Sequence, residues 1–445
     1  MQYELNPSEK IVLETIRKND FSLKSKIVEK SNLPWTTVAN SINSLIEKEW
    51  VKVVVENSKE FIQLNYQKLY FIGIAIGSSN IKISITDLRC SELKSSAFTK
   101  DMIKNITFDF ERLNDDFGSA QKKVFSYNKP DSALWCFVTP DNYVELSNLL
   151  SKICNVLLKN CDNIDVASIC FVFPGHIDVN NQTIVESKYA NIDIQASNIN
   201  SLLNYDVLYL IREKNILLFI DHNVKASTSY ELSCLMKNGV SQFSGNLAVI
   251  YMGFGIGMGL TINGQLYRGG NDSNLAGQFG HIFVNKVSNE YISTYFNNQP
   301  EVLDNCNQNT CDMLENILRE GVFYEIIKKI KDLNDEPTER ELRNLYKATS
   351  VSVLKNELLN NNIYKQKLAY YLGNEICNVV KILSINNFVF SGKLAELYSA
   401  FKAELQYVIM KNNCQMNINI IASENGEFSA SLGASEMAYR NTFNI

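Results

Sequence analysis

The sequence predicts an α/β protein that begins with a small helical segment. Apolar runs of strand length recur from residue 69 onward, with helical spacing between them, and most end in a polar or glycine turn. Before residue 66, three short amphipathic stretches precede two β-branched runs. Because 445 residues are enough for two or three domains, we divide the chain into an amino-terminal domain, 1–66, and a larger domain, 69–445.

The composition indicates the cellular compartment of the protein but not its mechanism. The net charge is −5, so bulk charge does not predict a nucleic-acid partner. The ten cysteines are scattered singly, which favours free thiols in a reducing compartment. The start of the chain is polar, and no apolar run reaches membrane-spanning length. We therefore expect a cytoplasmic protein with no membrane partner.

The amino-terminal domain is predicted to be a winged helix-turn-helix. Pro7 opens a first helix, Ser22 is a predicted N-cap for the second, and Pro34 stands at the start of the third. Two short strands then flank a hairpin turn at Asn57 and Ser58; they run over Val51–Val55 and Glu60–Leu64. This order is typical of domains that insert the third helix into the major groove of DNA.

The predicted DNA-contacting side chains lie at the start of the third helix. They are Trp35, Thr36, Thr37, Asn40 and Ser41, whose polar groups suit phosphates and base edges. Lys24 is predicted to neutralise phosphates, together with Lys26, Lys52 and Lys59. The alternative is a helical module that binds another protein and has no role at DNA.

A hairpin and five further strand-like segments are predicted in the larger domain. The first is a hairpin, and the others end in polar or glycine turns; they run over Phe71–Ile76 with Ile81–Thr86, Val166–Phe173, Ile216–Ile220, Leu247–Met252, Phe388–Phe390 and Ile418–Ala422. In α/β proteins ligands bind at the carboxyl ends of such strands. The turns after these strands are therefore the predicted ligand-binding positions.

The most informative run lies between residues 253 and 281. Glycines alternate at Gly253, Gly255, Gly257 and Gly259, which predicts a turn against a ligand, and Gln278 to His281 follow another glycine-rich turn. The run resembles the signature of the ROK family (repressors, open reading frames and sugar kinases). In that family a glycine turn leads to a Gly-Glu-x-Gly-His segment that binds sugar, and here Gln278 stands at the glutamate position.

The resemblance implies a two-lobed, actin-like ATPase fold of the sugar-kinase type, with a ligand cleft between the lobes. It covers nearly all of residues 69 to 440. Residues 91–163 are its weakest stretch and have no readable role in the sequence.

The groups that family kinases use for phosphoryl transfer are replaced in this chain. The metal-holding aspartate after the first strand corresponds to Ala75, and the catalytic aspartate corresponds to Asn223, preceded by His222. A methyl group cannot hold Mg²⁺, and an amide cannot take a proton at useful pKa. A shifted register that makes Asp221 the base misplaces Glu231. The family's Gly-Gly nucleotide turn reads Ser391-Gly392-Lys393, which decides nothing alone. We expect no enzymatic activity.

The same turns can still bind an uncharged polyol, because the replacements keep hydrogen-bonding capacity. The predicted sugar-binding residues are Gly175, His222, Asn223, Gln278 and His281. Asn191 matches a family ligand position only loosely. All three histidines of the chain, including His176, lie in these predicted turns; a structural role for each is the alternative.

Many family members carry zinc on the histidine of this segment and a downstream cysteine motif. His281, Cys306 and Cys311, with Asp304, form the corresponding set, but the motif's glycines are missing and Glu315 is displaced by two positions. We expect no cofactor; zinc at these residues is the alternative.

Together these features predict a transcriptional repressor of carbohydrate genes that binds operator DNA and a sugar or sugar-phosphate effector. A homodimer is expected, because helix-turn-helix proteins usually read two half-sites. The helices over Glu396–Met410 and Ser429–Asn441 are candidate dimer faces. An active sugar kinase and a sugar-sensing scaffold that no longer touches DNA remain the alternatives.

Overall fold

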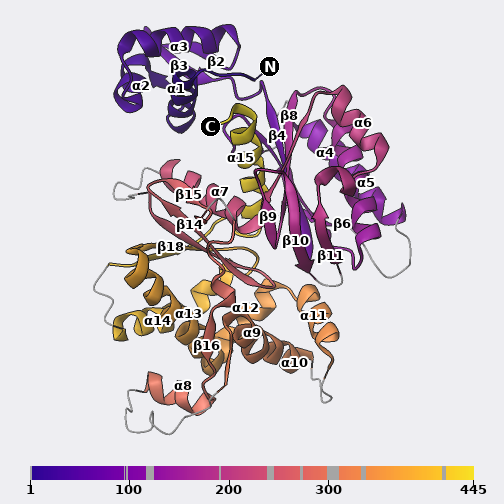
Figure 1. The fold of residues 1–445 in the computed structure, drawn as a ribbon, viewed down its shortest axis with the longest axis vertical. Coiled ribbons are helices and arrows are strands. Elements are labelled where there is room, and N and C mark those ends of the chain that lie inside the picture. The colour runs from indigo at the N-terminus through magenta and orange to yellow at the C-terminus, as the bar shows by residue number, and fades with distance from the viewer. Residues whose placement is uncertain are drawn as a thin grey trace. The chain divides into compact units, whose positions relative to one another are not determined.

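The computed structural model describes residues 3–94, 96, 99–116, 125–189, 192–237, 245–270, 274–297, 310–331, 337–412 and 417–445. Figure 1 shows a mixed α/β chain. It forms two compact units: residues 1–242, 270–274 and 430–445 make the first, and residues 243–269 and 275–429 make the second. Within the described residues, no helix is both long and apolar enough to cross a bilayer.

The first 64 residues fold into three helices and a small antiparallel sheet of order β1-β3-β2. The elements are α1 (Pro7–Lys18), β1 (Ser22–Leu23), α2 (Lys24–Ser31), α3 (Trp35–Glu47), β2 (Val51–Glu56) and β3 (Lys59–Leu64). Asn6 caps α1 in a reciprocal capping box with Glu9. The order and approximate bounds of the predicted elements are found in the structure, apart from β1, which the sequence pattern did not indicate.

Two local features of this segment follow from residue type. Asn57 and Ser58 both adopt left-handed backbone angles, with φ of 49° and 60°, as a two-residue hairpin turn requires. The prediction that Ser22 caps the second helix is wrong. Ser22 lies in β1 and its hydroxyl hydrogen-bonds to the carbonyl of Asn19, while Leu23 holds the N-cap position without a side-chain bond.

The core of the first unit is a six-stranded sheet of order β12-β8-β4-β5-β7-β6. Its strands are β4 (Tyr70–Ile76), β5 (Asn80–Asp87), β6 (Phe125–Asn128), β7 (Leu134–Val138), β8 (Val166–Phe173) and β12 (Leu217–His222). Strands β12, β8 and β4 are parallel to one another, and β5, β7 and β6 join antiparallel. A separate antiparallel sheet holds β9 (His176–Asp178), β10 (Thr183–Tyr189) and β11 (Ile192–Ser197).

Alternating side chains of the six-stranded sheet serve its two faces. Ile72 and Ile74 belong to the large apolar core that includes residues of α4 (Lys100–Asp116) and α5 (Tyr143–Asn160). On the other face Gly73 lies against α15 (Ser429–Phe443): a Cβ there would fall 2.0 Å from the carbonyl oxygen of Ser431. The first unit also contains η1 (Ile199–Leu202), α6 (Tyr205–Glu213) and α7 (Asn223–Lys237).

Residues 91–163, unreadable in the sequence, supply the outer part of this unit. They contribute α4, α5, the edge strand β6 and its neighbour β7. Trp135 of β7 is fully buried, and its indole N–H donates to Thr107 of α4 at 2.9 Å. The stretch therefore completes the first sheet and one of its helical layers.

The second unit is a five-stranded sheet of order β15-β14-β13-β18-β19 packed with helices. Its strands are β13 (Leu247–Met252), β14 (Ile256–Ile262), β15 (Gln265–Tyr267), β18 (Asn387–Ser391) and β19 (Asn419–Ala422), with β16 (Phe283–Asn285) and β17 (Cys311–Met313) forming a separate pair. Its helical segments are η3 (Phe279–His281), α8 (Asn289–Phe296), α9 (Leu314–Leu318), the π-helix η5 (Arg319–Tyr324), α10 (Glu325–Lys331), α11 (Glu339–Ala348), α12 (Val351–Asn360), α13 (Asn362–Leu383), η6 (Ala395–Leu397) and α14 (Tyr398–Lys411).

Candidate functional site

In the first unit, parallel pairing brings the ends of three strands to one edge of the sheet. Ala75 of β4 pairs with Val172 of β8, and Phe173 pairs with His222 of β12. The turns that follow β4, β8 and β12 therefore gather at the edge where α/β proteins bind ligands. The structure thus brings Gly175, His222 and Asn223 together at this edge.

Gly175 has a conformational reason to be glycine. Its φ is +104°, and a Cβ there would lie 2.3 Å from the carbonyl oxygen of Glu186 on β10. No side chain fits this position. Its place at the site is set by the close approach of β10 to the end of β8.

His222 and Asn223 form the junction between β12 and α7. His222 is half-buried, and its Nδ1 accepts from the Val224 amide at 3.2 Å; Asn223 is 9% exposed and opens the helix. Asp221 is 2% exposed, and its Oδ1 accepts from the His222 amide at 2.7 Å and from Asn274 Nδ2 at 3.3 Å. The only carboxylate among these three residues is therefore buried and hydrogen-bonded, and the amide stands at the helix start.

The turn after β4 is built without a carboxylate. Ala75 is buried on the strand, and the turn that follows is tied by Thr139, whose hydroxyl donates to the Gly77 carbonyl at 2.7 Å. The Thr139 amide donates to the carbonyl of Ser79 at 3.0 Å. The turn keeps its shape without the aspartate that a metal would require.

In the second unit, the glycine run is a hairpin rather than one long turn. Gly257 and Gly259 lie inside β14, paired with Tyr251 and Val249, so the prediction that all four glycines form a ligand-facing turn is wrong. Only Gly253 and Gly255 lie in the turn, closed by a 3.0 Å backbone bond between them. The alternation that suggested a turn is the period of a strand.

Gln278 is the N-cap of η3 and His281 is its last residue, and both residues are exposed. Gly280 lies between them with no room for a side chain, since a Cβ would fall 2.2 Å from the carbonyl oxygen of Ile256. Phe279 points into the apolar core and anchors the segment. The structure therefore brings the two predicted polar groups together on an anchored turn.

Glu315 also belongs to this site, although the sequence analysis noted it only as displaced from the family's cysteine motif. One carboxylate oxygen lies 3.6 Å from His281 Nε2, and the other accepts from the Ile256 amide at 3.3 Å. The second oxygen also stands where a Cβ on Gly255 or Gly280 would intrude, at 2.9 and 3.0 Å. Glu315 therefore braces both turns. The glycines at positions 255 and 280 were the sequence signal that another group lies close to both turns.

Only two of the predicted zinc ligands, His281 and Cys311, lie in the part of the chain that the structure describes, and these two lie apart. Cys306 and Asp304 lie outside the described residues. Cys311 is exposed on β17, paired with Asn285, whose Oδ1 lies 3.0 Å from its Sγ. His281 precedes β16 at the opposite end of this strand pair, about 13 Å along the chain from the residue that pairs with Cys311. Among the described residues, no three His, Cys, Asp or Glu side chains converge on a common metal position.

The Ser391-Gly392-Lys393 turn adjoins the glycine hairpin in the second unit. Gly392 has φ of +84°, and the Leu394 amide donates to the Met252 carbonyl at 3.0 Å. Tyr346 of α11 joins the two turns: its hydroxyl donates to the Gly253 carbonyl at 2.9 Å, and the Lys393 ammonium lies 6.0 Å from its ring centre. Burial raises the pKa of Tyr346, which remains a neutral donor.

The predicted DNA-contacting residues divide by exposure. Trp35, Thr36 and Asn40 are exposed on the first turns of α3, with Trp35 at 54%, and Thr37 is half-buried. Ser41 is only 4% exposed, so its prediction as a DNA contact is wrong. It shares the inward helical face of Val38 and Leu45. Lys24 is half-buried at the start of α2.

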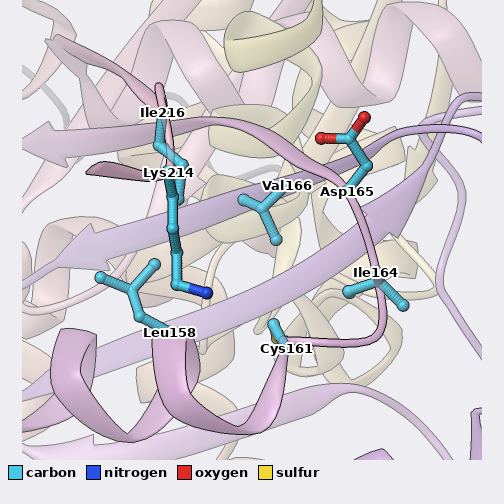
Figure 2. Close-up of a pocket in the computed structure, with 7 residues that line it drawn as sticks. All are labelled: Leu158, Cys161, Ile164, Asp165, Val166, Lys214 and Ile216. Carbon is cyan, nitrogen blue, oxygen red and sulfur yellow. The ribbon is translucent and has the colours of Figure 1, made fainter. Parts of the chain in front are cut away.

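A small cavity in the first unit lies away from the turns that hold Gly175 and Asn223. It has a volume of about 160 Å³ and is lined by Leu158, Cys161, Ile164, Asp165, Val166, Lys214 and Ile216. Figure 2 shows the Lys214 side chain extending along Leu158 while the Asp165 carboxylate turns away. Since Val166 opens β8 and Ile216 precedes β12, the cavity is at the opposite sheet edge from Gly175 and Asn223. Its size is below that of typical ligand pockets.

Comparison with known proteins gives the family. The ROK family model matches residues 139–441, more than half of the chain. A xylose repressor of Bacillus subtilis strain 168 is 22% identical over 286 residues, which is 62% of this chain and 60% of the repressor. The matched region is therefore less than two thirds of the repressor's length.

Solved structures show the shared fold. A ROK family transcriptional regulator, a homologue of the E. coli Mlc protein, matches with a TM-score of 0.59 at 12% identity over 98% of both chains. A putative N-acetylmannosamine kinase from Listeria monocytogenes matches with a TM-score of 0.50 at 13% identity, covering 84% of this chain and 99% of the kinase. With the family match, this establishes that the chain is a member of the ROK family.

Proposed function

We propose that this protein is a sugar-responsive, DNA-binding transcriptional repressor whose kinase-like domain has lost catalysis. Two features found in the same chain support this proposal. Ala75 and Asn223 stand at the positions of the kinase carboxylates, and the amino-terminal helical segment exposes Trp35, Thr36 and Asn40. Similarity to a xylose repressor and to a regulator over 98% of the chain supports it. Residues 1–66 act as the winged helix-turn-helix, and the chain binds its operator as a dimer.

The effector is a neutral monosaccharide. In the second unit, Gln278 and His281 are exposed beside the Glu315 carboxylate, a set that can donate to and accept from vicinal hydroxyls. In the first unit, taken by itself, His222 and Asn223 are polar residues without a full negative charge at the end of β12. Without a carboxylate at Ala75 to hold a metal or at Asn223 to take a proton from a ligand hydroxyl, binding proceeds without transfer of phosphate.

Replacing Gln278 by alanine should weaken monosaccharide binding about fivefold, because one hydrogen-bonding side chain contributes about 1 kcal/mol. Isothermal calorimetry with D-xylose and D-glucose measures it. Gln265→Ala is the matched control, since Gln265 is an exposed glutamine of β15 in the same unit. If Gln278→Ala and Gln265→Ala bind like the parent protein, Gln278 is not a ligand residue.

A sugar kinase is the second candidate, favoured by Asp221 next to Asn223 and by Lys393 beside the glycine hairpin. The full chain, incubated with Mg-ATP and a panel of hexoses, pentoses and N-acetylated hexosamines, should release ADP no faster than a blank. Loss of both metal carboxylate and base removes several orders of magnitude in rate. Sugar-dependent ADP release above the blank would contradict the proposed loss of catalysis.

A further inference from the structure

A buried group of charged side chains joins the amino-terminal helices to the kinase-like fold within the first unit. We name it the Arg17 junction: it contains Glu14 and Arg17 of α1, Ser233 of α7, and Glu436, Tyr439 and Arg440 of α15. Arg17 and Glu436 are 4% and 0% exposed. Charges this deeply buried are stabilised only when paired and hydrogen-bonded, so their positions are tightly specified.

The contacts of the junction form one connected network. Arg17 Nε donates to Glu14 Oε1 at 2.8 Å, and its Nη2 reaches Glu14 Oε2 at 3.1 Å and Glu436 Oε1 at 3.4 Å. The same oxygen of Glu436 accepts from Arg440 Nη2 at 3.1 Å and from the Ser233 hydroxyl. Tyr439 donates to Glu14 Oε1 at 2.7 Å and lies under the Arg17 guanidinium. One carboxylate oxygen thus links three helices.

The junction is charged at neutral pH. Burial alone would raise the pKa of Glu14, but the charge and hydrogen bonds of Arg17 outweigh it and bring this pKa down to about 2. Burial alone would lower the pKa of Arg17, but Glu14 and Glu436 raise it. Arg17 Nη1 is buried and makes no hydrogen bond to any residue that the structure describes. The guanidinium therefore depends on its two carboxylate partners and is sensitive to small shifts of α15.

Helix α15 is also locked to the start of α7. A Cβ on Gly433 would fall 1.8 Å from the Ala226 carbonyl oxygen, so the two backbones touch three residues after Asn223. The Ser233–Glu436 bond lies ten residues after Asn223, about 15 Å along α7. With contacts at two points on each helix, α15 cannot keep its place when α7 tilts.

The carboxyl end of α15 packs against the amino-terminal segment. The ring of Phe443 meets Trp50 at 5.0 Å and Tyr3 at 6.2 Å between centroids. Lys10 Nζ donates to the Asn444 carbonyl at 2.7 Å. Helix α15 is buried along most of its length, so the prediction that it provides a dimer face is wrong. The surface of α15 is covered by residues of its own unit.

We infer that the Arg17 junction is the coupling element of this protein: a shift at Asn223 moves α7, α7 moves α15, and Glu436 passes the shift to Arg17 and the amino-terminal helices. The inference rests on the proposed function, because it takes Asn223 as an effector-binding residue and residues 1–66 as the operator-binding domain. It names the residues that carry the coupling free energy between the two sites.

Two single substitutions cut the junction at different links. Ser233→Ala removes the bond between α7 and Glu436 and leaves the Arg17–Glu436 pair; Glu436→Gln keeps an acceptor for Ser233 and removes the charge that faces Arg17. Ser229→Ala is the matched control, because Ser229 is a buried serine one turn earlier on α7, outside the junction. Circular dichroism and thermal unfolding of each full-length variant exclude loss of fold.

The first readout needs no ligand. Hydrogen exchange of the α1 amides should be at least fivefold faster in Ser233→Ala and Glu436→Gln than in the parent protein, and unchanged in Ser229→Ala. Ser233 does not belong to the amino-terminal segment, so a response of α1 to Ser233→Ala reports transmission through Glu436. Exchange in α1 that matches the parent protein in both junction variants would overturn the inference.

The second readout is the ratio of operator affinities with and without saturating D-xylose, or D-glucose if calorimetry shows that it binds instead. Both junction variants should bring this ratio at least threefold closer to one while sugar affinity stays within threefold of the parent protein. A ratio of operator affinities equal to that of the parent protein in both variants would contradict the inference. If the parent protein binds neither operator nor sugar, the proposed function fails, and the exchange readout still judges the junction.

Discussion

The double substitution Trp35→Ala/Asn40→Ala should weaken operator binding by about two orders of magnitude and leave sugar binding intact. Both residues are exposed on the first turns of α3, where recognition helices meet base edges. Each such contact contributes about 1–3 kcal/mol. Fluorescence anisotropy with DNA from upstream of the protein's own gene, at fixed salt, measures the operator affinity, and calorimetry measures sugar binding.

Glu47→Ala is the control for this prediction, because Glu47 is exposed at the far end of the same helix. It should bind the operator within a few-fold of the parent protein. Equal affinity of the double variant and the parent would remove α3 from DNA recognition. If the parent itself does not retard its upstream DNA, a sugar-sensing scaffold becomes the better account.

Gly433→Ala should destabilise the protein by at least about 3 kcal/mol or prevent folding altogether. The added methyl would lie 1.8 Å from the Ala226 carbonyl oxygen, and both helices are buried there. The gain in helix propensity, about 1 kcal/mol, cannot offset a clash with backbone. Urea unfolding followed by circular dichroism measures the change in the free energy of unfolding.

Gly270→Ala is the matched control for overpacking, since the structure places no described heavy atom within 4 Å of a Cβ at that position. Its free energy of unfolding should stay within about 0.5 kcal/mol of the parent value. A Gly433→Ala variant as stable as Gly270→Ala would mean that α15 does not cross α7 in backbone contact.

The sequence was most informative where a pattern is local. The strands over Leu247–Met252 and Val166–Phe173 match β13 and β8, because uninterrupted apolar runs bounded by turn residues have few other solutions. The third helix and its hairpin were equally clear, because Pro34 and the Asn57-Ser58 pair mark boundaries. A wrong prediction arose where one pattern fits two structures: glycines at alternate positions suggested a turn, although the alternation is that of strand β14.

The features that the sequence did not reveal depend on contacts distant in the chain. Glu315 lies close to His281 because β16 pairs with β17. No local sequence pattern indicates that pairing. Ser41 looked like a DNA contact because serine is polar, although helical spacing places it with Val38 and Leu45. The Arg17 junction joins residues more than 400 positions apart, and nothing near Arg17 in the sequence indicates Glu436.

Under the proposed function, a phosphotransferase fold serves as a sensor that controls a DNA-reading domain. The most direct test is an anisotropy titration of the full chain with its upstream DNA, repeated across a panel of monosaccharides without ATP. We expect operator binding whose dissociation constant changes at least fivefold with one sugar and stays at its sugar-free value with the rest. Operator binding that ignores every sugar shown by calorimetry to bind the protein would contradict it.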